Sequence, residues 1–273
     1  MKTSLKTLFI LAPLMISCAH KGLDRKLADS RLDSLRHESL TRYSSVDLKK
    51  FSGIEKNIAL CHDGRYNEAL TAFKDVLDKN RKNPVYWNHL GTCYYLKGEY
   101  PKSLIYLDIS KGLTKNKKLH AAIENNIGLN HLGQKNYLEA KEAFKKSIEL
   151  DSTALTPRYN LAQLYLAKGL YGKAREMLKT LEKTNPKDVD VNYSLAHLRL
   201  MQNDYNGSLA YFKRIPSAYL KRDDVALNLA TAYYFLGEND KALKALDEAP
   251  MNVARFAIQQ TELKKRIERK ISN

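Results

Sequence analysis

The chain has 273 residues, 44% of them hydrophobic and 28% charged, and 46 Lys and Arg against 30 Asp and Glu give it a formal net charge of +16. Its length allows one or two ordinary domains. A basic excess of this size suits nucleic acid, anionic lipid or an acidic partner, but no basic-aromatic motif of a nucleic-acid module occurs, so we expect no nucleic acid ligand.

The beginning of the chain has the pattern of a secretory signal. Lys2 and Lys6 make a short positive region, residues 8–16 form an apolar run, and a small residue precedes Cys18. The apolar run is too short to span a bilayer as a stable helix. We therefore predict a signal peptide over residues 1–17, and export of the chain is a second argument against nucleic acid as a partner.

Residues 15–18, Met-Ile-Ser-Cys, resemble the bacterial lipobox. The resemblance implies that Cys18 becomes the acylated N-terminus and that the protein is held to a membrane through this lipid, because two or more acyl chains suffice for stable anchoring. Ala19 stands where an Asp often signals inner-membrane retention, so the expected location is the periplasmic face of the outer membrane. The alternative is a soluble periplasmic or secreted protein.

Residues 18–49 are interpreted as a lipid-anchored tether. Its leucines hint at an amphipathic helix, but several serines dilute the pattern. The leucines are Leu23, Leu27, Leu35 and Leu40. The favoured interpretation is a spacer that lifts the rest of the protein off the bilayer, and the alternative is a partner-binding helix.

The stretch 84–110 sets the pattern for most of the remaining chain. Its motif runs Trp87-x-x-Leu90-Gly91-x-x-Tyr94, then Gly98-x-Tyr100. Apolar residues at helical spacing lie on both sides of the glycine break. The stretch resembles the tetratricopeptide repeat, a helix-turn-helix unit of 34 residues. The resemblance implies an all-α fold, a right-handed α-solenoid in which each unit packs only on its neighbours.

About six such units fit the chain and predict a solenoid domain over residues 50–250. The predicted units begin at about Lys50, Pro84, Ala121, Leu155, Val189 and Asp223. The last four starts are 34 residues apart, and the step from Pro84 to Ala121 is three residues longer. We place the extra residues in the basic turn 114–118.

A last helix is predicted over residues 251–273. Its apolar stripe is formed by Val253, Phe256, Leu263 and Ile267. Terminal repeats of a solenoid need a cap with one polar face. We therefore interpret this segment as a C-terminal capping helix.

Two cysteines remain besides Cys18. Cys61 and Cys93 fall on the first helices of neighbouring units, and an oxidising compartment would permit a disulfide between them. The sequence does not supply the separation of their α-carbons. We expect buried free thiols, with a bridge as the alternative.

The family resemblance also implies a concave groove lined by the first helices, at the second, fifth, ninth, twelfth and thirteenth places of each unit. These places carry no Lys or Arg, so the inner curve is uncharged apart from two acids and can hold another chain. Apolar side chains would provide burial, and amides would satisfy the peptide backbone. The candidate groove residues are Asn88, Thr92, Tyr95, Asn125, Tyr159, Gln163, Tyr193, His197 and Tyr234.

Catalytic motifs are missing from the sequence. It contains no zinc motif, no nucleophile elbow and no phosphate loop, so we expect no enzyme activity, no cofactor and no small-molecule substrate. The predicted function is a scaffold that binds a segment of an envelope protein. The chain is similar to outer-membrane repeat lipoproteins that help type IV pilus secretins assemble. Alternatives are recruitment of peptidoglycan enzymes, a place in a barrel-assembly complex, and polyanion binding by a basic convex face.

Overall fold

A computed structural model describes residues 35–36, 47–250 and 252–272 of the chain. Every element in these residues is a helix and they contain no strand, which confirms the expected all-α class. The predicted signal peptide, Cys18 and most of the predicted tether lie outside the described residues. The helices are η2 (Leu48–Lys50), α1 (Gly53–His62), α2 (Tyr66–Asp75), α3 (Leu77–Asn80), α4 (Pro84–Lys97), α5 (Tyr100–Leu113), α6 (Lys117–Gly133), α7 (Tyr137–Leu150), α8 (Thr156–Ala167), α9 (Tyr171–Thr184), α10 (Val189–Met201), α11 (Tyr205–Phe212), α12 (Ser217–Leu220), α13 (Asp223–Phe235), α14 (Asn239–Asp247) and α15 (Ala254–Ser272).

The chain divides into two compact units. Unit 1 is Met1–Leu170 and unit 2 is Tyr171–Asn273. The division falls in the sequence between α8 and α9, the two helices that the repeat pattern assigns to the fourth predicted repeat.

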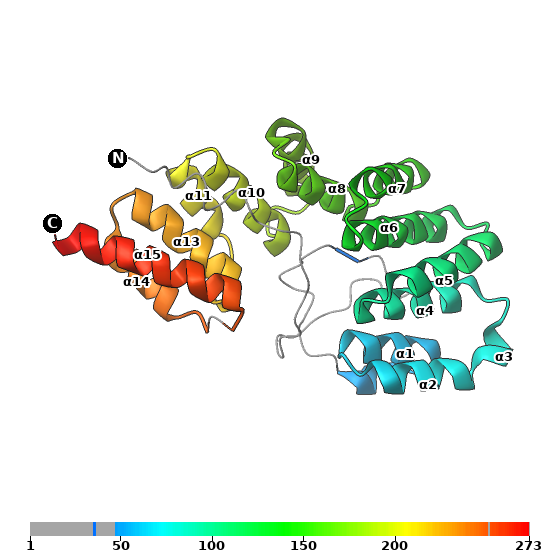
Figure 1. The fold of residues 1–273 in the computed structure, drawn as a ribbon. Helices are drawn as coiled ribbons and strands as arrows, with labels where there is room; N and C mark the ends of the chain where they lie inside the picture. Colours follow the sequence, from blue (N-terminus) through cyan, green and yellow to red (C-terminus); the bar gives the residue numbers. More distant parts are fainter. Residues whose placement is uncertain (1–34, 37–46, 251, 273) are drawn as a thin grey trace. The chain divides into compact units, whose positions relative to one another are not determined.

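Unit 1 is built from helix pairs joined by short turns (Figure 1). The pairs are α1 with α2, α4 with α5, and α6 with α7, and the first helices α1, α4, α6 and α8 contact one another in sequence order. The turn after α4 depends on Gly98, whose φ of 88° lies in the left-handed region. A residue without a β-carbon adopts that conformation at little cost, so the predicted glycine break ends the helix where expected.

Small residues let the two helices of a pair approach closely. A β-carbon added at Gly91 would lie 2.8 Å from Leu107 Cγ, and one added at Gly128 would lie 2.5 Å from Phe144 Cε1. Both partners are buried, with Phe144 at 0% exposure. The glycines in the first helices therefore make room for large apolar side chains of the second helices, as interior packing density requires.

The predicted position of the three extra residues is partly wrong. The turn between α5 and α6 covers only residues 114–116, and α6 begins at Lys117. The Asn116 side chain accepts hydrogen bonds from the main-chain N–H groups of Lys118 at 2.9 Å and Leu119 at 3.2 Å. This cap satisfies donors that a helix start leaves free, so Lys117 and Lys118 belong to α6, and Lys115 stays in the turn.

The junction of α5, α6 and α7 contains a buried carboxylate. Glu124 of α6 is 3% exposed and forms ion pairs with Lys111 of α5 at 2.9 Å and Lys146 of α7 at 3.0 Å. Burial raises the pKa of the Glu124 carboxyl, but the hydrogen bonds from the two lysines outweigh burial and hold the pKa below its usual value. The charge therefore stays ionised and ties three helices together.

Unit 2 contains the pairs α10 with α11 and α13 with α14, and α9 packs on α10. The second helices α11 and α14 end before Pro216 and Pro250, residues that cannot continue a helix interior. The last helix, α15, packs against α13 and α14 and buries Leu263 and Ile267 at 4% and 0% exposure. This confirms the expected C-terminal capping helix.

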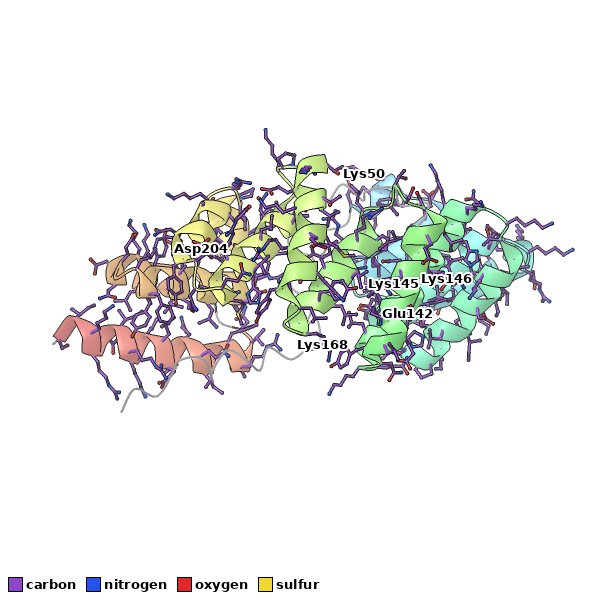
Figure 2. All side chains as sticks on the ribbon, turned by 90° about the horizontal axis from the view of Figure 1, so that it is seen from above. Lys50, Glu142, Lys145, Lys146, Lys168 and Asp204 are labelled. Carbon is purple, nitrogen blue, oxygen red and sulfur yellow. A yellow bond between two sulfur atoms is a disulfide. The ribbon has the colours of Figure 1, made fainter. Side chains whose placement is uncertain are left out.

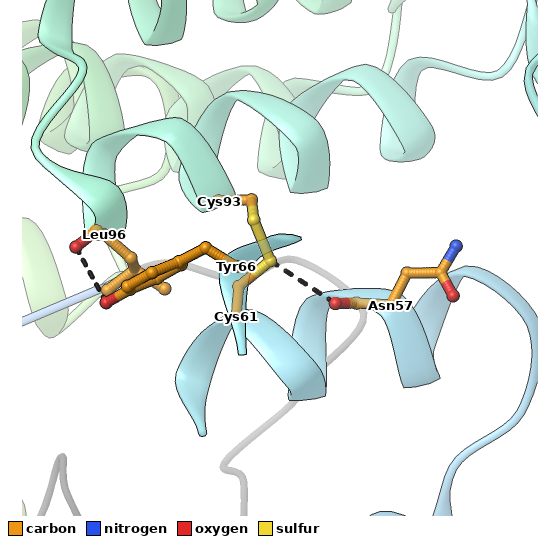
Figure 3. The surroundings of a disulfide bond; sticks show 5 residues. All are labelled: Asn57, Cys61, Tyr66, Cys93 and Leu96. Atoms are coloured by element: carbon orange, nitrogen blue, oxygen red, sulfur yellow. Dashed lines mark hydrogen bonds between the residues drawn. A yellow bond between two sulfur atoms is a disulfide. The ribbon is translucent and has the colours of Figure 1, made fainter. Parts of the chain in front are cut away.

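The expectation of free thiols at Cys61 and Cys93 is wrong. The two residues form a disulfide between α1 and α4, with their α-carbons 5.4 Å apart (Figure 3). Beside the bridge, the Tyr66 hydroxyl donates to the Leu96 carbonyl at 3.0 Å. The 3.4 Å contact from Cys61 Sγ to the Asn57 carbonyl is not a hydrogen bond, because a disulfide sulfur has no proton to donate. The packing of neighbouring first helices brings the cysteines within bonding range.

Candidate peptide-binding site

The first helices of unit 1 carry a cluster of buried amides. Asn88 and Thr92 lie on α4, Asn125 and Asn126 on α6, and Asn160 on α8, and all are at most 2% exposed. Asn126 Nδ2 donates to Asn88 Oδ1 and to Thr92 Oγ1, both at 3.2 Å. Asn160 Nδ2 donates to Asn125 Oδ1 at 2.7 Å. We call the four asparagines, together with the Thr92 hydroxyl, the amide cluster.

The amide cluster binds main-chain groups of a single residue, Leu35. The Leu35 carbonyl accepts from Asn160 Nδ2 at 2.8 Å and from Asn125 Nδ2 at 3.0 Å. The Leu35 N–H donates to Asn126 Oδ1 at 3.4 Å. Helices α6 and α8 therefore hold both polar groups of one peptide residue, a function for which the donor and acceptor ends of an asparagine side chain are suited.

Leu35 is buried and its neighbour Arg36 stacks on an aromatic ring. Leu35 is 2% exposed, and its side chain is among the largest that the described residues bury completely. Arg36 Cζ lies 5.1 Å from the centroid of the Tyr159 ring, within the range of a cation–π contact. Residues 35–36, the short blue segment flanked by grey in Figure 1, belong to no helix or strand.

This contact adds a finding to two expectations for unit 1, the tether and the groove, and both stay predictions. A spacer or a helix was predicted around Leu35, but Leu35 lies outside any helix and packs on the repeats. An inner curve left for another chain was also predicted, but the amides that would bind such a chain hold Leu35 instead. The contact could not be predicted from local periodicity, because it joins residues that are 90 to 125 apart in the sequence.

The remaining candidates on unit 1 are Tyr159, Gln163 and Tyr95. Tyr159 is 1% exposed and lies beneath Arg36. Gln163, one turn further along α8, is half-buried. Tyr95 is half-buried on α4, and its ring centroid lies 5.9 Å from that of Tyr100. The structure thus assembles Asn88, Thr92, Asn125 and Tyr159 around the bound segment, directly or through Asn126.

On unit 2, two of the three candidates share a polar cluster. The Tyr193 hydroxyl donates to Asp224 Oδ2 at 3.2 Å and accepts from Asn228 Nδ2 at 2.9 Å. The same Asn228 amide lies 3.3 Å from His197 Nδ1. Helices α10 and α13 are therefore bridged by side chains that could exchange hydrogen bonds with a ligand.

A paired charge completes this polar cluster of unit 2. Arg222 Nε and Nη2 contact the two oxygens of Asp224 at 2.6 and 2.5 Å. Burial raises the pKa of the Asp224 carboxyl, but the Arg222 guanidinium and the hydrogen bond from Tyr193 act together against burial, and the pKa lies below its usual value. The third candidate, Tyr234, contacts the capping helix instead, with Lys270 Nζ 5.0 Å from its ring centroid.

Three asparagines that bind or bridge were not among the predicted groove residues. They are Asn126, Asn160 and Asn228, each directly after or near a predicted position. Asn160 follows Asn126 by one repeat length of 34 residues, and Asn228 follows Asn160 by two repeat lengths. An asparagine recurring at one place of the repeat was therefore a usable signal, displaced by one residue from the positions that the family resemblance supplied.

The described part of the chain shows neither a metal site nor a membrane-spanning helix. No group of three or more His, Cys, Asp or Glu residues there is arranged to hold a metal ion. Among the same residues, no helix combines the length and the apolar character needed to cross a membrane.

Two profiles of the tetratricopeptide repeat match the chain, over residues 62–116 and 131–198. These stretches therefore contain tetratricopeptide repeats. Among curated proteins, the chain is 22% identical over 242 residues to anaphase-promoting complex subunit 3 of Schizosaccharomyces pombe and 22% identical over 180 residues to cellulose synthase operon protein C of Pseudomonas fluorescens. It spans 35% of the first protein and 14% of the second.

Solved structures with the same fold include PilW, described as a widely conserved type IV pilus biogenesis factor, with a TM-score of 0.62 and 18% identity over 76% of this chain and 96% of PilW. PilF of Pseudomonas aeruginosa gives a TM-score of 0.63 and 15% identity over 77% of this chain and 95% of PilF. YrrB, a repeat protein with an unusual peptide-binding site, gives 0.51 and 18% over 71% of this chain and 98% of YrrB. At these identities the similarity shows the fold, an all-α solenoid of the tetratricopeptide type.

Proposed function

We propose that this protein is a non-enzymatic scaffold that binds a segment of a partner protein through the first helices of unit 1. The observation that carries the proposal is the amide cluster, which holds the carbonyl and the N–H of Leu35. A site that reads main-chain groups and buries one aliphatic side chain suits a peptide segment rather than a small polar molecule. The repeats at residues 62–116 and 131–198 support a role in protein interaction.

The proposed place of action is the bacterial envelope. The signal pattern of residues 1–17 and the lipobox ending at Cys18 support export and lipid anchoring. The disulfide between Cys61 and Cys93 supports an oxidising compartment, because structural disulfides persist there and are rare in the cytosol. We propose that the protein is located at the periplasmic face of the outer membrane. Its specific role there would be to assist assembly of a type IV pilus secretin. The pilus role rests on the sequence resemblance, and the likeness to PilW adds the fold alone.

Crosslinking in living cells tests the binding site. A photoreactive amino acid at Gln163, half-buried beside Tyr159, should crosslink a partner in the full chain. The same amino acid at Lys145 should not, because Lys145 projects from α7, a second helix of a repeat (Figure 2). The Gln163 product should disappear when Asn125 and Asn160 are both replaced by Ala. Equal products from both positions, or a product that survives the asparagine replacements, would contradict the proposed site.

Metabolic labelling tests the anchor. Palmitate should be incorporated into the wild-type protein and not into a Cys18→Ala variant, and the variant should move from the membrane to the soluble fraction. Absence of label from the wild type would overturn the lipid anchor without affecting the binding site. Deletion of the gene tests the pilus role, which predicts monomeric secretin; normal secretin multimers in the deletion strain would exclude it.

A further inference from the structure

The amide cluster already has a ligand in this chain. Leu35 provides the carbonyl, the N–H and the buried side chain that the site accepts, and Arg36 provides a cation for the face of Tyr159. We propose that residues 35–36 are an internal occupant of the peptide site, and that a partner binds by displacing them with a segment of the same chemistry. This inference rests on the proposed function and names the kind of segment that the site accepts.

The contacts define that segment. Two donors, Asn125 Nδ2 and Asn160 Nδ2, converge on one carbonyl oxygen, so the residue at this position must lie outside a helix, where its carbonyl is free. The side chain of that residue is buried to 2% exposure, which favours an aliphatic group the size of leucine and disfavours a charge. The next residue stacks on Tyr159 and is a cation. The site therefore selects a leucine followed by Arg or Lys.

Covalent attachment makes the internal segment a strong competitor. A tethered ligand acts at an effective concentration that reaches the millimolar range for short linkers. The apparent affinity for a partner is reduced by the fraction of molecules in which the site is free. The wild-type chain should therefore bind a matching segment weakly, and removing the internal leucine should uncover a stronger site.

Fluorescence anisotropy with a labelled synthetic peptide of residues 30–41 tests this directly. The full chain with Leu35→Asp should bind the peptide at least ten-fold more tightly than the wild-type chain. The matched control is Leu138→Asp, the same change at a leucine of α7 that is 63% exposed, and it should bind like the wild type. A peptide carrying Leu35→Asp should not bind, and one carrying Arg36→Ala should bind several-fold more weakly. Adding Asn125→Ala and Asn160→Ala to the Leu35→Asp chain should abolish binding.

Equal affinity of the wild-type and Leu35→Asp chains for the peptide would overturn the proposal. A second measurement avoids substitutions in the protein: excess unlabelled peptide should increase hydrogen exchange at the Leu35 amide of the wild-type chain, and an unchanged exchange rate would contradict displacement. Because the probe comes from this chain, the result is independent of the envelope partner. Tighter peptide binding by Leu35→Asp without a Gln163 crosslink would support the internal occupant and reject the proposed function. A Gln163 crosslink together with unchanged peptide affinity would support the proposed function and reject the internal occupant.

Discussion

Asn160 Nδ2 donates a hydrogen bond to the main-chain carbonyl of Leu35 at 2.8 Å, across 125 residues of sequence. The bond holds residues 35–36, which precede the repeats in the sequence, against α8. Both groups are buried, so the carbonyl depends on amides for partners that water would otherwise supply.

Replacing Asn160 by Ala should lower the stability of unit 1 by about 1 kcal/mol, because one of two donors to the Leu35 carbonyl is lost while Asn125 remains. Replacing Asn125 as well should bring the total to about 2–3 kcal/mol, since the carbonyl then has neither amide donor. Denaturant unfolding followed by circular dichroism measures both. The control is Asn67→Ala on the exposed face of α2, which should leave the midpoint unchanged. Equal effects of the control and of Asn160→Ala would contradict the role of the amide.

Replacing Gly128 by Ala should destabilise the α6–α7 pair by about 1–3 kcal/mol, because the new β-carbon would lie 2.5 Å from the Phe144 ring. Gly112→Ala on α5 is the matched control. A β-carbon at Gly112 has no heavy atom within 4 Å, so its higher helix propensity should raise stability by up to about 1 kcal/mol. Thermal unfolding should move in opposite directions for the two variants. A shift of the same sign would show that close packing does not decide the Gly128 position.

Replacing Cys61 and Cys93 together by Ala should cost about 3–4 kcal/mol, because the bridge closes a loop with a sequence separation of 32 and restricts the unfolded chain. A reducing agent should lower the unfolding temperature of the wild type to a similar extent. The double variant should not respond to the reducing agent, which separates the bridge from other effects. An unchanged wild-type unfolding temperature after complete reduction would contradict the prediction.

Glu124 should make the free energy of unfolding decrease at acidic pH. Its folded-state pKa is lowered by Lys111 and Lys146 in spite of burial, so the ion pairs contribute fully above the ordinary carboxyl pKa of about 4.3 and are lost as pH falls through the lower folded value. Glu124→Gln should cost about 1–3 kcal/mol at pH 7 and flatten the decline in unfolding temperature below pH 4.5.

The matched control for Glu124 is Glu142→Gln on α7. Glu142 also faces two lysines, at 2.9 Å from Lys141 and 3.7 Å from Lys145, but its side chain is 57% exposed. Figure 2 shows it with Lys145 and Lys146 along the same helix. Water and salt screen such pairs, so this variant should unfold like the wild type. Equal losses for the two glutamates would show that burial does not decide the strength of the pair.

The helix pairs could be predicted from sequence because their signals are local. Apolar periodicity, the break at Gly98 and the small residue at Gly91 act within one repeat, and each is reproduced in the structure. The boundary at α6 was missed because it depends on the Asn116 cap. That cap is also local, and Asn before a helix start is a recognised signal.

The contacts that define the candidate site could be predicted only in part. The family resemblance supplied Asn88, Thr92, Asn125 and Tyr159 as groove residues, and that role stays a prediction; the 34-residue recurrence could have added Asn160. The sequence does not show that Leu35 binds these residues, because that contact depends on three-dimensional packing across at least 90 residues. The expectation of free thiols at Cys61 and Cys93 was wrong for the same reason: the spacing allowed a bridge, but only the packing of α1 on α4 brings the sulfurs together.

With the proposed lipid on Cys18, the internal segment would also set how far the repeats can reach from a bilayer. An extended chain spans at most about 3.5 Å per residue, so Leu35 held in its site keeps the repeats within about 60 Å of an acylated Cys18. When a partner displaces Leu35, the limit is set instead by η2 at Leu48 and rises to the order of 100 Å. Partner binding would then increase the maximum distance between Cys18 and the repeats. The repeats of the partner-free protein would stay close to the lipid surface, and those of the partner-bound protein could reach an assembly further away.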